Sequence, residues 1–532
     1  MRAGKSGGVR GKALHLTLGD LHIGNGRLLP LRRRIGKGVE KSAEAIVARK
    51  ARVKGRIEQC KEPVGDDSMG VEHPKAEGDP KAPSHPGASG DGGTETGAYE
   101  VAQAPAASEP GRALTEKLME EVCRPENLNR AYKRVKANKG APGVDGITVG
   151  EVSGWLKAHK GPLLRSLLDG SYQPQPVRGV QIPKPGGGMR QLGIPTVVDR
   201  VVQQAISQVL EPILDPTFSE FSFGFRPGRS AHQALQQASA YVKEGRSIVV
   251  DMDLEKYFDR VNHDILMARL ARHVADKRLL WIVRRFLQAG MMQDGVCIRR
   301  EEGTPQGGPL SPLLANLLLD DLDKELERRG HFFCRYADDC NIYVGSQKAG
   351  ERVLASVTGF LEKKLKLRVH PKKSAVARTS ERKFLGYCIL VGGRLGIAPA
   401  SLKRMKDRVR RITRRNRGVR FERVIEELNR FLPGWVAYFR HAEAKTALRR
   451  SDEWIRRKLR CYRLKQWKRP RTIWDRLTKA GISRREAANL ASTGKGWWRK
   501  AGTPALQRAM PNQWFEHLGL VNLTQRYLLF QH

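Results

Sequence analysis

The 532-residue sequence lacks the features that would assign it to several common classes of protein. It contains no run of about 18 apolar residues, so no segment is predicted to span a membrane. Its seven cysteines include no CxxC pair, and this spacing indicates neither a zinc ribbon nor a disulfide framework. No secretory hydrophobic region is visible near residue 1. We therefore expect a protein that works in a reducing, intracellular environment.

Acidic residues are few compared with basic ones. Lys and Arg number 97 and Asp and Glu number 55, which gives a formal net charge of +42. Self-repulsion on this scale is unfavourable unless a polyanion neutralises it. Hydrophobic residues make up 40% of the chain, which fits a folded protein. The charge balance therefore indicates nucleic acid as the first partner to consider.

Composition also divides the chain. Residues 1–110 have a basic start, a Gly/Pro/Ser/Ala-rich stretch and almost no aromatic residues, so a disordered leader is expected there. An upstream in-frame extension without a role is the alternative. Strands are expected at residues 177–183 and 247–254 and a helix at 309–326, a mixture typical of an α+β or α/β fold around a sheet. From about residue 400 the chain becomes basic and is predicted to be helical.

The sharpest motif is the run Tyr336, Ala337, Asp338 and Asp339, which lies between two apolar stretches. Apolar stretches around a short polar break predict a β-hairpin with both acids at its tip. Adjacent carboxylates repel each other unless cations share them, and Mg²⁺ favours carboxylate oxygens and substrate phosphates. An ordinary solvated turn is the alternative, since Asp is common in turns.

A second acidic motif follows the strand expected at residues 247–254. Alternation along a strand places Asp251 and Asp253 on the same face. A carboxylate from this strand, brought beside the hairpin tip, would complete a two-metal site for an in-line phosphoryl displacement. For Asp251 itself, a helix cap or a salt bridge is the favoured interpretation. A third element, the glycine-rich loop at residues 303–312, permits close backbone approach to a ligand.

Taken together and in this order, these motifs resemble those of a reverse transcriptase of the group II intron type. The resemblance covers about residues 114–532. It implies an α+β fold shaped as a right hand, in which fingers and a palm with an antiparallel sheet precede a helical thumb. Further markers of the resemblance are residues 172–186, 190–196, 223–232, 306–307 and 384–387.

The resemblance also assigns regions of the chain. Residues 111–240 would form an N-terminal extension and the fingers, and residues 241–395 would form the palm. Residues 396–475 would form the thumb or maturase domain, which grips intron RNA in the family. Residues 476–532 resemble a DNA-binding region of related proteins. Because no Cys/His-rich cluster follows, endonuclease activity is not expected, and priming would use a nick made elsewhere.

The catalytic assignments are implied by the resemblance alone. Asp253, Asp338 and Asp339 resemble the palm triad that holds two Mg²⁺ ions, with Asp253 and Asp338 as the main ligands and Asp339 in a more electrostatic role. Phe258 resembles the steric gate, a bulky ring that would collide with a ribose 2′-hydroxyl and so select deoxynucleotides. A core phenylalanine is the alternative interpretation of Phe258.

Further binding residues are carried over in the same way. Lys184 and Arg190 resemble the fingers pair that grips the incoming triphosphate, and Gln306 resembles the residue that contacts the sugar. Lys373 matches a family lysine near the active site and is expected to contact nucleic acid or to donate a proton. For the aromatic residues of the thumb, a place in the helical core is the alternative. The other residues expected to bind nucleic acid are Arg414, Arg415, Trp435, Tyr438, Arg456 and Arg457.

The resemblance thus predicts an RNA-directed DNA polymerase that copies group II intron RNA into DNA and assists splicing and mobility. Its expected partners are intron RNA, a DNA primer or target, and deoxynucleoside triphosphates, with no membrane. A bacterial cytoplasmic location, associated with the nucleoid, is expected. Two rival hypotheses stay open. One is an RNA-binding maturase with a vestigial polymerase, and the other is a reverse transcriptase recruited to phage defence or spacer acquisition.

Overall fold

The structure is a computed structural model that describes residues 115–183, 187–293, 296–298 and 300–531. The leader expected at residues 1–110 and the binding residue Lys184 lie outside the described residues. None of the described helices is long and apolar enough to cross a membrane.

The first described helices pack around one buried helix, α6 (Val197–Leu214). Thr196 caps this helix by accepting a hydrogen bond from the backbone N–H of Asp199, which satisfies one of its free amide groups. Apolar residues occur around most of the circumference of α6, so it is buried on several sides. The helices that lie against it include α3 (Leu118–Cys123) and α4 (Pro125–Ala137), and α5 (Val152–Leu168) contacts α3.

A four-stranded sheet, called here the hairpin sheet, is formed by two strands that precede α6 and two strands that follow it. Strands β1 (Val177–Pro183) and β2 (Met189–Ile194) form an antiparallel hairpin. Strand β4 (Met291–Gln293) pairs with β1 in parallel, and β5 (Val296–Ile298) pairs with β4. The predicted strand at residues 177–183 is therefore confirmed, and the order is β2-β1-β4-β5.

A second four-stranded sheet, called here the central sheet, has the order β6-β7-β3-β8 and is antiparallel throughout. Its strands are β3 (Ile248–Met252), β6 (Phe332–Tyr336), β7 (Asp339–Val344) and β8 (Ala375–Arg378). The predicted β-hairpin at residues 336–339 is confirmed, because β6 and β7 pair up to the positions of Tyr336 and Asp339.

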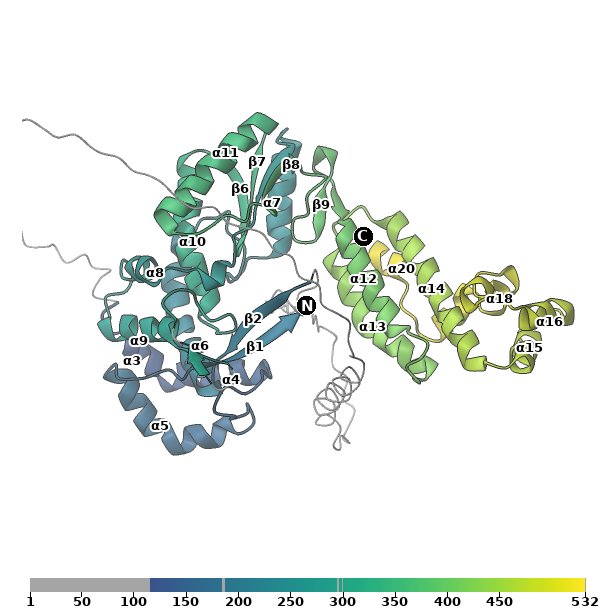
Figure 1. Cartoon of the computed structure of the whole chain (residues 1–532), viewed down its shortest axis with the longest axis horizontal. Coiled ribbons are helices and arrows are strands. Elements are labelled where there is room, and N and C mark those ends of the chain that lie inside the picture. Colours follow the sequence, from purple (N-terminus) through teal and green to yellow (C-terminus); the bar gives the residue numbers. More distant parts are fainter. Residues whose placement is uncertain (1–114, 184–186, 294–295, 299, 532) are drawn as a thin grey trace, which may run out of the picture. The chain divides into compact units, whose positions relative to one another are not determined.

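Helices cover both faces of the central sheet. Neighbouring residues of a strand point to opposite faces, and Val249 and Val250 belong to two separate hydrophobic clusters. Val249 shares its cluster with α7 (Ala231–Lys243), whereas Val250 shares its cluster with α10 (Ser311–Arg328) and α11 (Gln347–Phe360). Figure 1 shows α10 and α11 beside this sheet. The sheet is therefore a rigid layer with core on both sides.

Helices make up most of the chain after the central sheet. Strands β9 (Tyr387–Ile389) and β10 (Leu395–Ile397) form a small ladder that leads into α12 (Pro399–Ile412). Helices α13 (Phe421–Tyr438) and α14 (Lys445–Trp467) follow, and their apolar faces join the same cluster as Val249. The name basic helices is used below for α12, α13 and α14.

The remaining elements complete the order along the chain. The mixture of helices and mainly antiparallel sheets confirms the predicted α+β class. The elements not yet named are η1 (Asp215–Thr217), η2 (Tyr257–Asp259), α8 (His263–Leu270), α9 (Lys277–Gln288), η3 (Leu361–Leu365), η4 (Val391–Gly393), α15 (Pro470–Lys479), α16 (Arg484–Ser492), α17 (Trp497–Lys500), α18 (Pro504–Ala509), α19 (Asn512–His517) and α20 (Leu523–Leu528).

Candidate active site

The turn that carries Asp338 and Asp339 is held by a buried arginine. Ala337 adopts a left-handed backbone conformation (φ 58°), which is costly for a residue with a Cβ. The guanidinium of Arg335, which is fully buried, donates to the carbonyl oxygen of Ala337 over 2.9 Å. It also donates to the carboxylate of Asp323 over 2.7 Å. This network fixes the backbone immediately before the two acids.

A glycine lets a second segment pack directly on the same turn. A Cβ placed on Gly224 would lie 2.3 Å from the backbone nitrogen of Ala337, which is too close for any side chain. Asn316 donates to the carbonyl of Gly224 over 2.8 Å and accepts from Arg335 over 2.9 Å. The turn is therefore enclosed between this segment and the Arg335 network.

The strand register brings the third acid beside the turn. Met252 is paired with Cys340 at the end of the β3–β7 ladder, so Asp253 and Asp339 are the next residues along these two neighbouring strands. Burial is the main cause that raises the pKa of Asp338, and the negative charge of the Asp253 carboxylate raises it further. Burial and the carboxylates of Asp338, Asp251 and Asp253 raise the pKa of Asp339 to about 7. Three acids that are far apart in the sequence therefore lie within electrostatic reach of one another.

The donor chemistry of these acids fits a hard divalent cation. Carboxylate oxygens are the ligands that Mg²⁺ prefers, and a bound cation would relieve the repulsion that raises the pKa values. Within the described part of the chain, however, no group of three or more His, Cys, Asp or Glu side chains is already arranged to hold a metal ion. The Asp253 carboxylate instead contacts the Lys373 ammonium, with Nζ 3.2 Å from Oδ1. The three acids are neighbours whose side chains would have to turn toward a shared ion.

Asp251 has a different environment from the triad. Its carboxylate forms an ion pair with Arg382, whose Nη2 lies 2.6 Å from Oδ2. With its amide oriented to satisfy its neighbours, Asn341 also donates to Asp251 Oδ1 over 3.3 Å. Burial raises the pKa of Asp251 in spite of Arg382. The salt bridge favoured from the sequence for this residue is confirmed.

The residues expected to bind the nucleotide come from three segments that touch one another. Phe258 is half-buried in η2, and its carbonyl oxygen accepts from the backbone N–H of Thr304 over 2.7 Å. The carbonyl oxygen of Gln306 accepts from the N–H of Gly193 in β2 over 3.1 Å. At Gly307 (φ 136°) a Cβ would lie 2.7 Å from the Gly193 carbonyl oxygen. The glycine-rich loop is thus fastened both to η2 and to the hairpin sheet.

Arg190, on the hairpin sheet, acts electrostatically on one of the acids. It lies on β2 opposite Ile182 and is exposed. Its positive charge favours ionisation of Asp338 and so opposes the rise in the pKa of that residue. Of the pair expected to grip a triphosphate, the structure places Arg190 within electrostatic reach of the candidate metal ligands.

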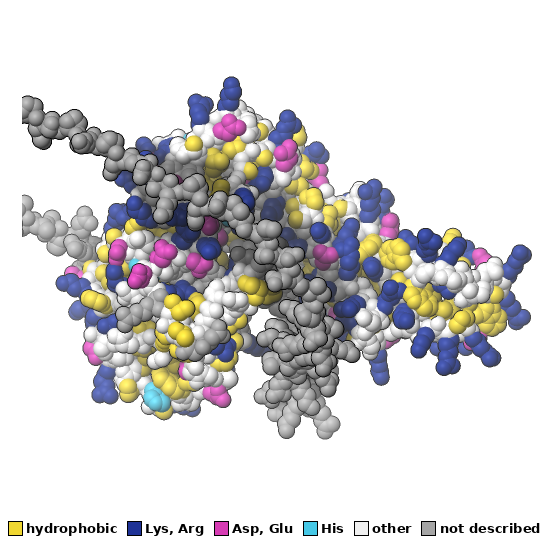
Figure 2. Space-filling view, in the orientation of Figure 1, with side chains coloured by type: hydrophobic (Ala, Val, Ile, Leu, Met, Phe, Trp, Pro, Cys, Tyr) yellow, Lys and Arg dark blue, Asp and Glu magenta, His cyan; other side chains and the backbone are white. Residues whose placement is uncertain are grey.

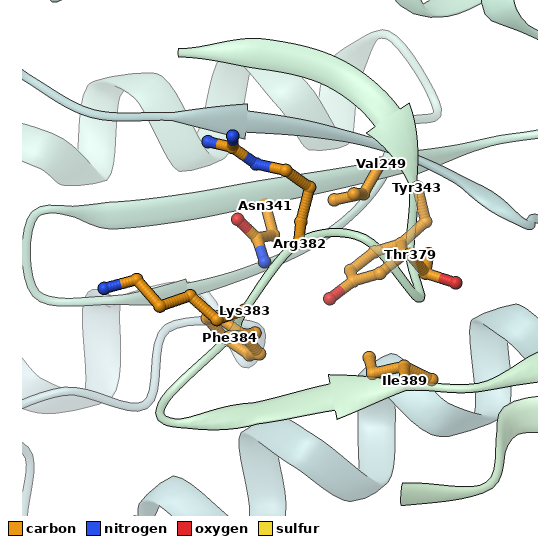
Figure 3. Close-up of a pocket in the computed structure, with 8 residues that line it drawn as sticks. All are labelled: Val249, Asn341, Tyr343, Thr379, Arg382, Lys383, Phe384 and Ile389. Atoms are coloured by element: carbon orange, nitrogen blue, oxygen red, sulfur yellow. The ribbon is translucent and has the colours of Figure 1, made fainter. Parts of the chain in front are cut away.

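A small pocket lies between the central sheet and the loop that precedes β9 (Figure 3). The hydroxyl of Tyr343 is buried at this pocket and has no hydrogen-bond partner in the described residues. The pocket is lined both by the central sheet and by the segment that contains Phe384, one of the residues that carry the family resemblance. Its lining residues are Val249, Asn341, Tyr343, Thr379, Arg382, Lys383, Phe384 and Ile389.

The aromatic residues expected to bind nucleic acid occupy the core of the basic helices. Trp435 is only 8% exposed, and its ring packs 4.8 Å from that of Phe439. Tyr438 is half-buried, and its hydroxyl donates to the carbonyl of Leu385 over 2.7 Å. The alternative interpretation, that these rings are helical core, therefore describes both residues better.

The expected cations, in contrast, are at the surface. Arg414 and Arg415 are exposed, and Arg456 and Arg457 are half-buried. The guanidinium of Arg457 lies 4.2 Å above the ring of Trp498. On the face seen in Figure 2, Lys and Arg side chains far outnumber Asp and Glu over the helices that follow the central sheet.

Sequence reasoning missed one part of this surface. The ammonium of Lys458 lies 5.7 Å from the ring of Trp454 and 5.1 Å from the ring of Trp498. The Arg410 guanidinium lies 5.6 Å from the Trp454 ring. The spacing of four residues between Trp454 and Lys458 on one helix is the signal that could have found the first of these contacts.

Comparison with known proteins identifies the class. The family described as reverse transcriptase (RNA-dependent DNA polymerase) matches residues 182–389, and the group II intron, maturase-specific domain matches residues 402–481. The protein YkfC of Escherichia coli (strain K12) is 33% identical over 327 residues, which are 54% of this chain and 85% of YkfC. The chain therefore belongs to the reverse transcriptase family, in its group II intron type with a maturase-specific domain. The reverse transcriptase match indicates RNA-directed DNA polymerase activity.

A second relative and one solved structure extend the comparison. The group II intron-encoded protein LtrA of Lactococcus lactis subsp. cremoris is 30% identical over 336 residues, which are 51% of this chain and 56% of LtrA. The chain thus spans about half the length of that relative. A partial Cas6-RT-Cas1–Cas2 complex contains a chain that is 26% identical, with a TM-score of 0.32 and coverage of 47% of this chain and 43% of that one.

Proposed function

We propose that this protein copies group II intron RNA into DNA and assists the splicing and mobility of that intron. The observation that carries the proposal is the meeting of Asp253 with Asp338 and Asp339 at adjoining strand ends of the central sheet. The central sheet would serve as the palm, the hairpin sheet as part of the fingers and the basic helices as the thumb. The match to the maturase-specific domain supports an intron RNA as the partner.

The reaction follows from the chemistry of phosphoryl transfer. The primer 3′-hydroxyl displaces pyrophosphate from the α-phosphorus of a deoxynucleoside triphosphate, and positioning and electrostatics supply most of the rate. Arg190 would hold the triphosphate, the Phe258 ring would exclude a ribose 2′-hydroxyl, and Gln306 would contact the sugar. Asp253, Asp338 and Asp339 would hold two Mg²⁺ ions, which would neutralise phosphate charge and activate the primer hydroxyl.

The basic helices would bind the RNA. Arg414, Arg415, Arg457 and Lys458 offer positive charge to phosphates, and exposed aromatic rings among such cations can stack on unpaired bases. Because neutralised phosphates release counterions, binding should weaken steeply as salt concentration rises. The exposed Trp498 ring, rather than the buried Trp435 ring, is the candidate for base stacking.

Two assays on the full chain test the proposal. The first is extension of a DNA primer on an RNA template with Mg²⁺, with a chelator as the control. The second is splicing of the group II RNA encoded beside the gene. The proposal predicts Mg²⁺-dependent incorporation of deoxynucleotides together with faster splicing. Splicing without incorporation would support a pure maturase, and incorporation without any flanking group II RNA would support a recruited reverse transcriptase.

A further inference from the structure

The turn at residues 370–374 contacts Asp253 through both backbone and side chain. The backbone N–H of His370 donates to the carbonyl oxygen of Asp253 over 2.8 Å. The hydroxyl of Ser374 accepts from the backbone N–H of Asp253 over 2.9 Å. Lys373 adds its ammonium to the Asp253 carboxylate, with Nζ 3.2 Å from Oδ1. The placement of this turn and the placement of Asp253 therefore depend on each other.

Arg382 reaches back to the same turn from the loop after β8. Its Nη2 donates to the carbonyl oxygen of Lys373 over 2.6 Å. Its Nε donates to Asp251 Oδ2 over 2.8 Å, and Nη2 lies 2.6 Å from the same oxygen. Asp251 belongs to β3 and precedes Asp253 by two residues. One guanidinium therefore joins the strand that leads to the candidate metal ligand with the turn that supports it.

The direction of the side chain agrees with these contacts. In Figure 3 the charged ends of Arg382 and Lys383 point to the left of the view, away from Val249, Tyr343 and Ile389 on the right. Arg382 is 30% exposed and Asp251 is 19% exposed. The pair is thus at the edge of the site, where a substitution leaves no large cavity in the core.

We propose that Arg382 is a positioning residue for nucleotidyl transfer, which holds the 370–374 turn so that the Lys373 ammonium stays on Asp253. The proposal deepens the proposed function and rests on it for its catalytic part. An arginine suits this role because its planar fork bonds two acceptors in fixed directions. A lysine at the same position offers one compact charge and would hold either Asp251 or the turn less firmly.

The first experiment measures the position of Lys373 without any reaction. The full chain, free of nucleotide, is treated with an amine-reactive reagent, and labelling of Lys373 is followed by mass spectrometry with the adjacent Lys372 as the internal reference. Arg382→Gln is expected to raise the labelling rate of Lys373 about threefold, because its ammonium is then held less firmly. Arg378→Gln is the matched control, since Arg378 is exposed at the end of β8 and the charge change is the same.

The second experiment measures single-nucleotide extension. Arg382→Gln is expected to lower the maximal rate about tenfold while the half-saturating nucleotide concentration stays within about twofold, because geometry and not binding is disturbed. Arg382→Lys should recover part of the rate. The double variant Arg382→Gln with Lys373→Gln should be no slower than Lys373→Gln alone, since both changes disturb one coupled unit.

The outcomes separate this proposal from the proposed function. Unchanged Lys373 labelling in both Arg382 variants, or multiplicative rate losses in the double variant, would overturn the role of Arg382. If the wild-type chain extends no primer, the proposed function fails, whereas the labelling experiment still decides whether Arg382 holds the turn. If Arg382→Gln unfolds at a lower temperature than the wild type, Arg382→Lys is the variant that tests the proposal. Wild-type labelling of Lys373 together with a wild-type extension rate in Arg382→Lys would overturn the proposal.

Discussion

The central sheet and the basic helices differ in whether their cationic side chains are paired with carboxylates. Arg335 and Asp251 belong to the central sheet, and they are paired with Asp323 of α10 and with Arg382 of the loop after β8; the pair of Arg335 with Asp323 is fully buried. On and beside the basic helices Arg415, Arg457 and Lys458 gather around the buried Cys461, where burial raises the pKa of the thiol and these three cations only partly oppose the rise.

The comparison assigns different roles to paired and unpaired charges. No ion pair joins Arg414, Arg415, Arg457 or Lys458 to a carboxylate within the part of the chain that the structure describes. Paired charges in the central sheet keep the acids in place, whereas unpaired cations leave their charge available for phosphates. Among the described residues, no ion pair joins the carboxylates of Asp338 and Asp339 to a Lys or Arg side chain, and these acids are the counterpart in the central sheet, available for cations.

The largest expected effect comes from removing the unpaired acids. Asp338→Ala combined with Asp339→Ala should reduce cDNA synthesis by a factor of about 10⁴ or more, because the charge that holds the metal ions is lost. RNA affinity should stay within about twofold, since the cations of the basic helices are untouched. Primer extension and filter binding measure the two quantities. Normal extension by the double variant would reject the site assignment.

The next largest effect tests a buried pair. Arg335→Met should lower the free energy of unfolding by about 3–5 kcal/mol, because it leaves the Asp323 carboxylate buried without a partner. Replacing both residues, Arg335→Met with Asp323→Leu, should recover part of that loss. Urea denaturation measures both variants. A single variant as stable as the wild type would contradict a structural role for the pair.

A smaller effect is expected from the unpaired cations. Arg414→Ala with Arg415→Ala should reduce the slope of log RNA affinity against log salt concentration by about 2, which is one unit for each phosphate contact. The free energy of unfolding should stay within about 0.5 kcal/mol, because exposed charges that form no ion pair with a described carboxylate contribute little. Arg328→Ala, an exposed arginine paired on α10, is the control for charge alone. An unchanged salt dependence would remove these two residues from the RNA surface.

The last expected effect concerns pH. Burial and the neighbouring carboxylates raise the pKa of Asp339 to about 7, from an ordinary value of 3.8. Without divalent ions the folded chain therefore binds this proton more tightly than the unfolded chain, and the resulting stability is lost as pH rises toward 7. Asp339→Asn should flatten that part of the stability curve. Urea denaturation with a chelator, at about pH 5 and about pH 7.5, measures the difference. Equal slopes in both proteins would contradict the raised pKa.

Local patterns in the sequence were sufficient to predict the elements that carry the acids. Short apolar runs beside polar residues predicted β3 and the β6–β7 hairpin, and the expected helix at residues 309–326 is present as Ser311–Arg328. These signals are short-range, because strand alternation and turn residues are properties of neighbouring positions. The proximity of Asp253 to the hairpin tip came instead from the family resemblance.

Contacts between distant segments could not be predicted. Arg382 lies 131 residues from its partner Asp251, and no local pattern relates the two positions. Arg335 lies in an apolar run, where a sequence does not reveal that its guanidinium is buried and paired. The interpretation of Trp435 as a nucleic-acid contact was open for a similar reason, because helical spacing does not tell which partner covers an aromatic face.

Binding of Mn²⁺, which stands in for Mg²⁺, tests most directly whether the three acids form one metal site. Electron paramagnetic resonance would count the ions bound to the full chain with a primer on an RNA template and a non-hydrolysable deoxynucleotide. The wild type should bind two ions, and Asp253→Asn or Asp338→Asn should weaken binding by about tenfold or more. Wild-type stoichiometry and affinity in both variants would contradict the shared site.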